Sequence, residues 1–133
     1  MLQRLWILAR ARRDFAFERT LAGLGHERWL QQLHAWGYRS HLIFLALPYP
    51  TLAVARVAER VRQGGHGVPE HLVRRRYASG LRNLFETYMH AVGSWQVYDN
   101  SDMRGPRLIA SGGAGQTRRI ADPIAWAELE KQR

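Results

Sequence analysis

The run HLIFLAL, from His41 to Leu47, constrains the fold more than any other part of this sequence. An unbroken apolar run of this length is typical of a β-strand that is covered by other elements on both faces. Pro48 and Pro50 follow at once and predict the end of the strand, because proline lacks the N–H that a strand ladder needs. Such a strand belongs in a sheet with helices packed against it.

Helix and strand patterns alternate along the rest of the chain. Alternating helices and strands predict an α/β layered fold with a mainly parallel sheet. Its 133 residues predict a single domain, with a helix over 1–14, a core over 15–111 and a tail with a short helix over 112–133. We expect helices near residues 1–13, 27–36, 51–63, 69–88 and 122–133, and strands at FAFER (15–19), HLIFLAL (41–47), WQVYD (95–99) and PRLIA (106–110), with SGGAGQ (111–116) as a flexible connector.

Composition excludes several classes of protein. The chain has no cysteine, so disulfides and thiolate metal sites are excluded and nothing argues for export. No apolar run approaches the ~20 residues of a membrane span, and no secretory signal is recognisable. We therefore expect a cytoplasmic protein without membrane contact.

The net charge of +9 predicts an anionic partner or a crowded basic face. Among the 20 basic residues only Lys131 is a lysine, and it lies near the end of the sequence in EKQR. These residues therefore contain no Walker A loop of the form G-x-x-x-x-G-K-[ST]. A basic nucleic-acid-binding protein is an alternative, although no recognised nucleic-acid motif supports it.

The segment from Arg62 to Asn83 joins a Gly-Gly-His-Gly loop to a helix that carries three consecutive arginines. Glycines let a loop swing and bring backbone N–H groups close to an anion. Opposite the apolar stripe of this helix lie Arg75 and Arg82, whose planar guanidinium groups suit phosphate oxygens. The pattern predicts a lid over phosphate, spanning residues 62–88. A solvated basic face on a surface helix is the other interpretation.

Polar residues follow two of the expected strands. In open α/β sheets ligands bind beyond the carboxyl ends of the strands. This rule singles out Glu18 and Thr20 after the first expected strand, and Asp99, Asn100 and Ser101 after the third. Glu18 could accept hydrogen bonds from substrate hydroxyls or act as a base, or it could simply pair with an arginine, and the YDNS segment could form a tight turn. The six histidines show no metal-ligand spacing, and no nucleophile motif is present, so we expect neither a protein-held metal nor a catalytic residue.

The segments FAFERTLAG, GYRSHLIFLALPYP, RQGGHGVPEHLVRRRYASGLRN, YDNS and PRLIA, in this order, resemble the C-terminal two thirds of bacterial zeta toxin-type proteins. These are P-loop small-molecule kinases, and some phosphorylate UDP-N-acetylglucosamine. The resemblance extends from Phe15 to Trp126. It implies a P-loop-kinase-like three-layer fold that uses ATP with Mg²⁺ and transfers phosphate to a small-molecule acceptor.

The resemblance also implies roles for individual residues. Glu18 and Thr20 would lie in the acceptor pocket, although Arg19 stands where the family usually has threonine. Arg62, Arg75 and Arg82 would contact ATP phosphates, and Asp99 and Asn100 would form a turn on the nucleotide side.

One departure from the family is larger than any substitution. The family's first strand, its Walker A loop and the helix and acid after them have no counterpart in residues 1–133. Phosphoryl transfer depends on that cradle, so the resemblance implies a kinase remnant that is inactive alone. The family's first strand lies between the strands matching FAFER and HLIFLAL, and its loss would leave two strand edges free. These edges could close on each other, cause self-association, or pair with a separate P-loop chain, which would make the protein a binding module.

Overall fold

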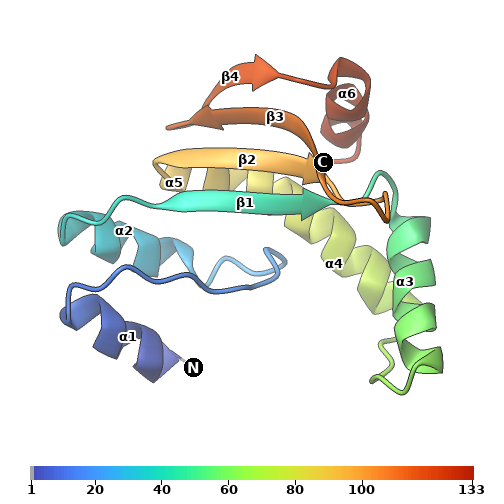
Figure 1. Cartoon of the computed structure of the whole chain (residues 1–133), viewed down its shortest axis with the longest axis horizontal. Helices are drawn as coiled ribbons and strands as arrows, with labels where there is room; N and C mark the ends of the chain where they lie inside the picture. Colours follow the sequence, from blue (N-terminus) through green and yellow to red (C-terminus); the bar gives the residue numbers. More distant parts are fainter. Residues whose placement is uncertain (1) are drawn as a thin grey trace.

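The computed structural model describes residues 2–133 and shows an α/β fold built on a four-stranded open sheet (Figure 1). The α/β class expected from the sequence is confirmed. In chain order the elements are α1 (Leu2–Arg10), α2 (Glu27–Ala35), β1 (His41–Ala46), α3 (Pro50–Arg62), α4 (Glu70–Asn83), the π-helix η1 (Leu84–Tyr88), α5 (Met89–Ala91), β2 (Ser94–Asp99), β3 (Arg107–Gly113), β4 (Gln116–Ile120) and α6 (Pro123–Lys131).

The sheet is mixed, and the expectation of a mainly parallel sheet is wrong. The strand order is β1-β2-β3-β4, with β1 parallel to β2 and the other two pairs antiparallel. A parallel connection needs a crossover of a dozen or more residues, which the segment through α3, α4, η1 and α5 provides between β1 and β2. Only residues 100–106 join β2 to β3, and a two-residue turn joins β3 to β4, so these strands must run antiparallel.

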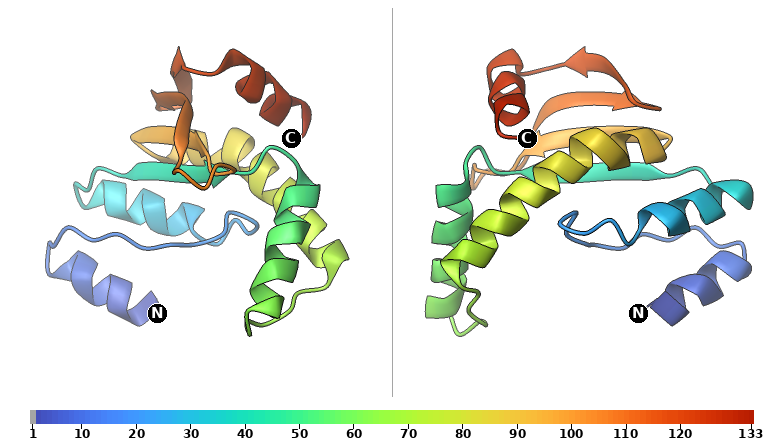
Figure 2. Two further views of the ribbon diagram at one scale, coloured as in Figure 1. Left: turned by 45° about the vertical axis from the view of Figure 1, so that its right-hand side comes forward. Right: turned by 180° about the vertical axis from the view of Figure 1, so that it is seen from behind.

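Helices cover one face of the sheet. Phe44 on β1 and Val97 on β2 are paired neighbours on that face, and Leu30 of α2, Leu84 of η1 and Trp126 of α6 pack in the same core. In the right view of Figure 2, which looks at the molecule from behind, α4 and the helical turns after it cross in front of β1 and β2. On the opposite face Ile43 is 62% exposed and Leu45 is 51% exposed, so the third layer of the expected fold does not cover these side chains.

FAFER is not a strand, contrary to the sequence prediction. Residues 13–20 form neither helix nor strand and run beside α1 and α2 (Figure 1). Phe15 and Phe17 pack instead into a separate aromatic cluster around Trp29, which lies 5.2 Å from Phe17 between ring centroids. The alternation of aromatic residues therefore reflects packing on helices. Within residues 2–133, β1 pairs only with β2 and its second edge is free.

The glycine-rich segment 111–116 is not a flexible connector. Ser111 to Gly113 belong to β3, and residues 116–120 of the expected tail form strand β4. Ala114 and Gly115 have φ of 50° and 78°, and positive φ at both central residues is the signature of a tight type I′ hairpin turn. The turn fixes the register of the hairpin.

The expected helices are confirmed, with one change at the long helix. The segment predicted as one helix over 69–88 is α4 followed by the π-helix η1. Helices α3 and α4 pack against each other as an antiparallel hairpin, the α3–α4 hairpin, which extends from the carboxyl ends of β1 and β2 (Figures 1 and 2). Within residues 2–133 no helix combines the length and apolar character that crossing a membrane requires.

Candidate functional site

The α3–α4 hairpin carries much of the positive charge of the molecule. Residues 50–83 contain seven arginines and two glutamates, a net charge of +5 out of +9 for the whole chain. Arg62 pairs with Glu59 at 2.6 Å and Arg74 pairs with Glu70 at 3.0 Å, both on the surface. Within residues 2–133 the other hairpin arginines, apart from Arg56, form no ion pair or side-chain hydrogen bond; they are Arg60, Arg75, Arg76 and Arg82.

Two side chains fix the base of the hairpin to the strand ends. Arg56 of α3 donates to the carbonyl oxygen of Asn100 at 2.6 Å and to that of Ser101 at 3.3 Å. Tyr77 of α4 donates from its hydroxyl to the carbonyl oxygen of Leu47 at 2.7 Å. Burial raises the pKa of Tyr77 to about 12, although a hydrogen bond with Gln132 opposes the shift. The hairpin is thereby held at the edge of the sheet where ligands bind in open α/β folds.

The predicted phosphate-binding arginines all lie on the surface of this hairpin. Arg62 ends α3 in its ion pair with Glu59, which occupies one side of its guanidinium group. Arg75 and Arg82 lie about two turns apart on α4, opposite its buried stripe, and both are exposed. No hydrogen bond or ion pair in the described part of the chain connects these three arginines with the other predicted site residues.

Asp99 is the last residue of β2, and Asn100 follows it at the carboxyl end of the strand. Asp99 is 8% exposed, and its carboxylate accepts from the backbone N–H of Ser101 at 2.8 Å and from Arg107 at 3.2 Å. Burial acts to raise the pKa of Asp99, but the hydrogen bonds from Ser101 and Arg107 outweigh it and leave the pKa lowered. Asn100 takes part through its backbone, which donates to Ala46 and accepts from Arg56.

Glu18 and Thr20 lie on the exposed part of the extended segment before α2. Glu18 forms no ion pair within residues 2–133, so the proposed pairing with an arginine is not observed. The loop that follows is held by the long helix. Asn83 donates to the carbonyl oxygen of Leu21 at 2.7 Å, and the Tyr88 hydroxyl donates to that of Gly23 at 2.6 Å. Burial raises the pKa of Tyr88.

A cavity of about 470 Å³ lies at the carboxyl ends of β1 and β2, between the sheet and α6. Its polar lining consists of Tyr49, Asp99, Arg107, Asp122 and Glu128. Three carboxyl groups against one guanidinium make this cavity unsuited to phosphate, and Asp122 is already engaged as the N-cap of α6 through Ala125.

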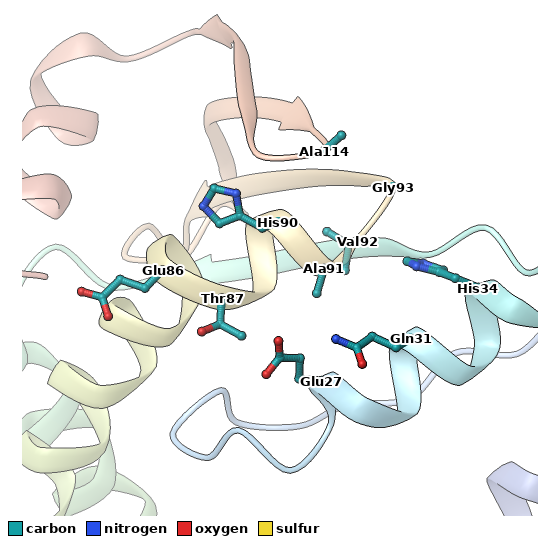
Figure 3. A pocket seen from close by; sticks show the side chains of 10 residues that line it. All are labelled: Glu27, Gln31, His34, Glu86, Thr87, His90, Ala91, Val92, Gly93 and Ala114. Atoms are coloured by element: carbon teal, nitrogen blue, oxygen red, sulfur yellow. The ribbon is translucent and has the colours of Figure 1, made fainter.

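A second cavity of about 480 Å³ lies between α2 and the η1–α5 segment (Figure 3). Glu27 and His34 line it from α2, Glu86 and His90 line it from the opposite side, and Ala114 of the β3–β4 turn closes one end. Neither arginine nor lysine is among the lining residues, although the chain is strongly basic. This cavity is therefore also unsuited to an anionic ligand.

Among residues 2–133 no group of three or more His, Asp or Glu side chains is arranged to hold a metal ion. Sequence reasoning missed the residues that organise the site, namely Arg56, Tyr77, Asn83, Tyr88 and Arg107. Their partners lie between 8 and 65 positions away in the sequence, and no local pattern signals such contacts.

Comparisons with protein-family models, with curated proteins and with solved structures found no match. The resemblance to zeta toxin-type proteins consequently stays a prediction from the sequence segments quoted above.

Proposed function

We propose that this chain is the lid and acceptor-side part of an ATP-dependent small-molecule kinase of the zeta toxin type. One observation carries the proposal: a hairpin of net charge +5, with four arginines free of protein partners within residues 2–133, is anchored at the carboxyl ends of the two parallel strands. Guanidinium groups without carboxylate partners are available to bind phosphate oxygens in bidentate fashion.

The described residues suit the phosphates of Mg-ATP but not its Mg²⁺ ion. Arg75 and Arg82 can hold phosphate oxygens, whereas no cluster of carboxylates suited to Mg²⁺ occurs in residues 2–133. ATP supplies the phosphoryl group in the proposed reaction. The lysine and hydroxyl that cradle its phosphates in a Walker A loop would have to come from another segment or another chain.

Phosphate binding is tested by titrating pyrophosphate into the purified chain at low salt, where exposed charges are least screened. We expect Arg75→Ala and Arg82→Ala each to weaken binding about fivefold, which corresponds to the ~1 kcal/mol of one solvent-exposed ionic contact. The matched control is Arg118→Ala, which removes an exposed arginine of β4 and should change binding less than about twofold. Equal losses in all three variants would show diffuse surface charge and refute the lid.

The same chain should neither hydrolyse ATP nor phosphorylate UDP-N-acetylglucosamine, since residues 1–133 contain no Walker A motif. Turnover that Arg62→Ala or Arg75→Ala abolishes would contradict this prediction. Turnover that survives both changes would come from a contaminant.

The free edge of β1 favours a second function, that of a binding module that accepts a strand from a partner. The other edge strand, β4, carries Arg118 and Arg119, whereas HLIFLA has no charged residue and no proline to discourage pairing. Ile43 and Leu45 add an exposed apolar surface next to this edge. Such an edge could also pair with a second copy of the chain.

Light scattering across a concentration series tests this second function. We expect the wild type to associate and Leu45→Lys to remain monomeric, because a lysine on an edge strand opposes strand addition. Gln96→Lys, on the same face but on the inner strand β2, is the control and should associate as the wild type does. A wild type that is monomeric at every concentration would contradict self-association.

A further inference from the structure

Two side chains of the long helix hold the loop that follows Glu18 and Thr20. Asn83 is the last residue of α4 and Tyr88 is the last residue of η1, and they bond carbonyl oxygens of Leu21 and Gly23 at 2.7 and 2.6 Å. Tyr88 has no exposed surface, so its hydroxyl is fixed in direction by packing on all sides. The contacts join segments that are more than 60 residues apart in the sequence.

The π-helix makes this double contact possible. Side chains five positions apart point about 140° away from each other around a regular α-helix, and could not both reach carbonyl groups two residues apart. A π-helix has hydrogen bonds from residue i to i+5, which bring positions five apart onto one side. The π-helix from Leu84 to Tyr88 therefore aligns Asn83 with Tyr88. π-Helical turns are rare and occur frequently at functional sites.

The same helix carries three of the four free arginines of the α3–α4 hairpin, while Arg60 lies on α3. Arg76 lies two turns before Asn83 and shares its flank of α4, whereas Arg75 and Arg82 lie further round toward solvent. A change in the position of α4 is thus transmitted to the loop through two directed hydrogen bonds. No other side-chain hydrogen bond within residues 2–133 connects α4 or η1 with residues 15–25.

We propose that Asn83 and Tyr88 are positioning residues that couple phosphate binding on the α3–α4 hairpin to the placement of Glu18 and Thr20. The inference rests on the proposed function, because it assigns the hairpin to phosphate and the loop to the acceptor. Anion binding at the arginines changes the position of α4, and the two hydrogen bonds transmit this change to the segment that carries Glu18 and Thr20.

Nuclear magnetic resonance with pyrophosphate as the ligand tests the coupling in the full chain. Gly64 and Gly67 lie in the loop of the hairpin, and Gly23 and Gly25 lie in the loop held by Tyr88, so their amide signals report the two regions separately. We expect both pairs of signals to shift with one common midpoint in the wild type. In Tyr88→Phe and in Asn83→Ala the hairpin signals should shift with a midpoint within about twofold of wild type, and the loop signals should stay still.

Tyr98→Phe is the matched control, because the Tyr98 hydroxyl reaches only Gln96, at 3.4 Å, far along the chain from the loop. It should retain both sets of shifts. The coupling would be overturned if pyrophosphate shifted the hairpin signals of the wild type but not its loop signals. It would also be overturned if the loop signals still shifted in both Tyr88→Phe and Asn83→Ala. Hairpin signals that do not respond to pyrophosphate would overturn the proposed function itself. Asn83→Ala keeps the test available if Tyr88→Phe unfolds the chain.

Discussion

Removing the hydroxyl group of Tyr77 should destabilise the fold in a way that depends on pH. This hydroxyl donates to the carbonyl oxygen of Leu47 at 2.7 Å and contacts Gln132 at 3.3 Å, so it connects α4 with the end of β1 and with the C-terminal residues. A neutral hydrogen bond contributes about 1 kcal/mol net. We expect Tyr77→Phe to lower the free energy of unfolding by about that amount at pH 7.

The pH dependence follows from the pKa of Tyr77, which burial raises from 10.0 to about 12. The folded protein keeps the phenol proton more tightly than the unfolded chain does. The stabilisation is therefore complete below pH 10 and is lost as the pH rises from about 10 to about 12. A shift of two units corresponds to about 2.7 kcal/mol, and partial solvent exposure of the ring reduces this to about 1 kcal/mol.

Urea unfolding monitored by tryptophan fluorescence, at several pH values from 7 to 11, gives the required free energies. The wild type should exceed Tyr77→Phe by about 1 kcal/mol at neutral pH, and the difference should shrink above pH 10. Tyr98→Phe should match the wild type throughout, since its hydroxyl makes one long contact on the open face of the sheet. A difference that stays constant up to pH 11 would refute the assignment of the raised pKa to Tyr77.

Two further substitutions test the packing of the sheet. Gly112→Ala should lower the free energy of unfolding by about 3 kcal/mol and so lower the midpoint of thermal unfolding, because the added Cβ would lie 2.6 Å from the Trp95 ring and even closer to backbone. The control Gly23→Ala has open space around it and should change the midpoint little. Trp126→Ala removes a ring that stacks on Trp95, with 5.7 Å between ring centroids, and should lower the free energy of unfolding in urea by about 3–5 kcal/mol. The control Ile124→Ala alters a side chain that is 81% exposed and should change this free energy by less than about 0.5 kcal/mol.

Local patterns were sufficient to predict most of the elements. The apolar run of β1 and the helical spacing of α2, α3 and α4 each determine their own structure, because the burial they need is visible within one segment. The same approach failed at β4. QTRRI is exposed along its whole length, so no alternation marks it as a strand. It is a strand because the turn at Ala114 and Gly115 folds it onto β3, and an Ala-Gly pair signals such a turn weakly.

FAFER shows the opposite error. Its alternating aromatic residues predict a strand, and the backbone is indeed extended, but a strand also needs a partner for its hydrogen bonds. Phe15 and Phe17 are held by the rings of Trp29 and Tyr38 instead. A pattern of side chains specifies which residues are buried, and it does not specify whether a neighbouring strand is present.

In the candidate site, too, some residues could be predicted from the sequence pattern and others could not. The arginines of α4 are visible in the sequence, because a helical stripe places Arg75 and Arg82 opposite the buried face. The contacts that anchor the hairpin and clamp the loop could not be predicted, since Arg56 and Tyr88 act on backbone carbonyl groups. Any residue has a carbonyl group, so sequence carries no sign of such partners.

The distribution of charge indicates where an anionic ligand would have to bind. Both cavities are lined by more carboxylates than arginine or lysine side chains, whereas the free arginines lie on the outer surface of the α3–α4 hairpin. A phosphate held by this hairpin alone would remain largely in water, where each contact is weak. Strong binding requires a second surface that faces the hairpin and excludes solvent from the phosphate. The unprotected edge of β1 lies beside the base of the hairpin, so a strand added there would bring its own end to that position. A partner strand that completed the sheet would thus also exclude water from a phosphate held by the arginines, which would connect the two proposed functions.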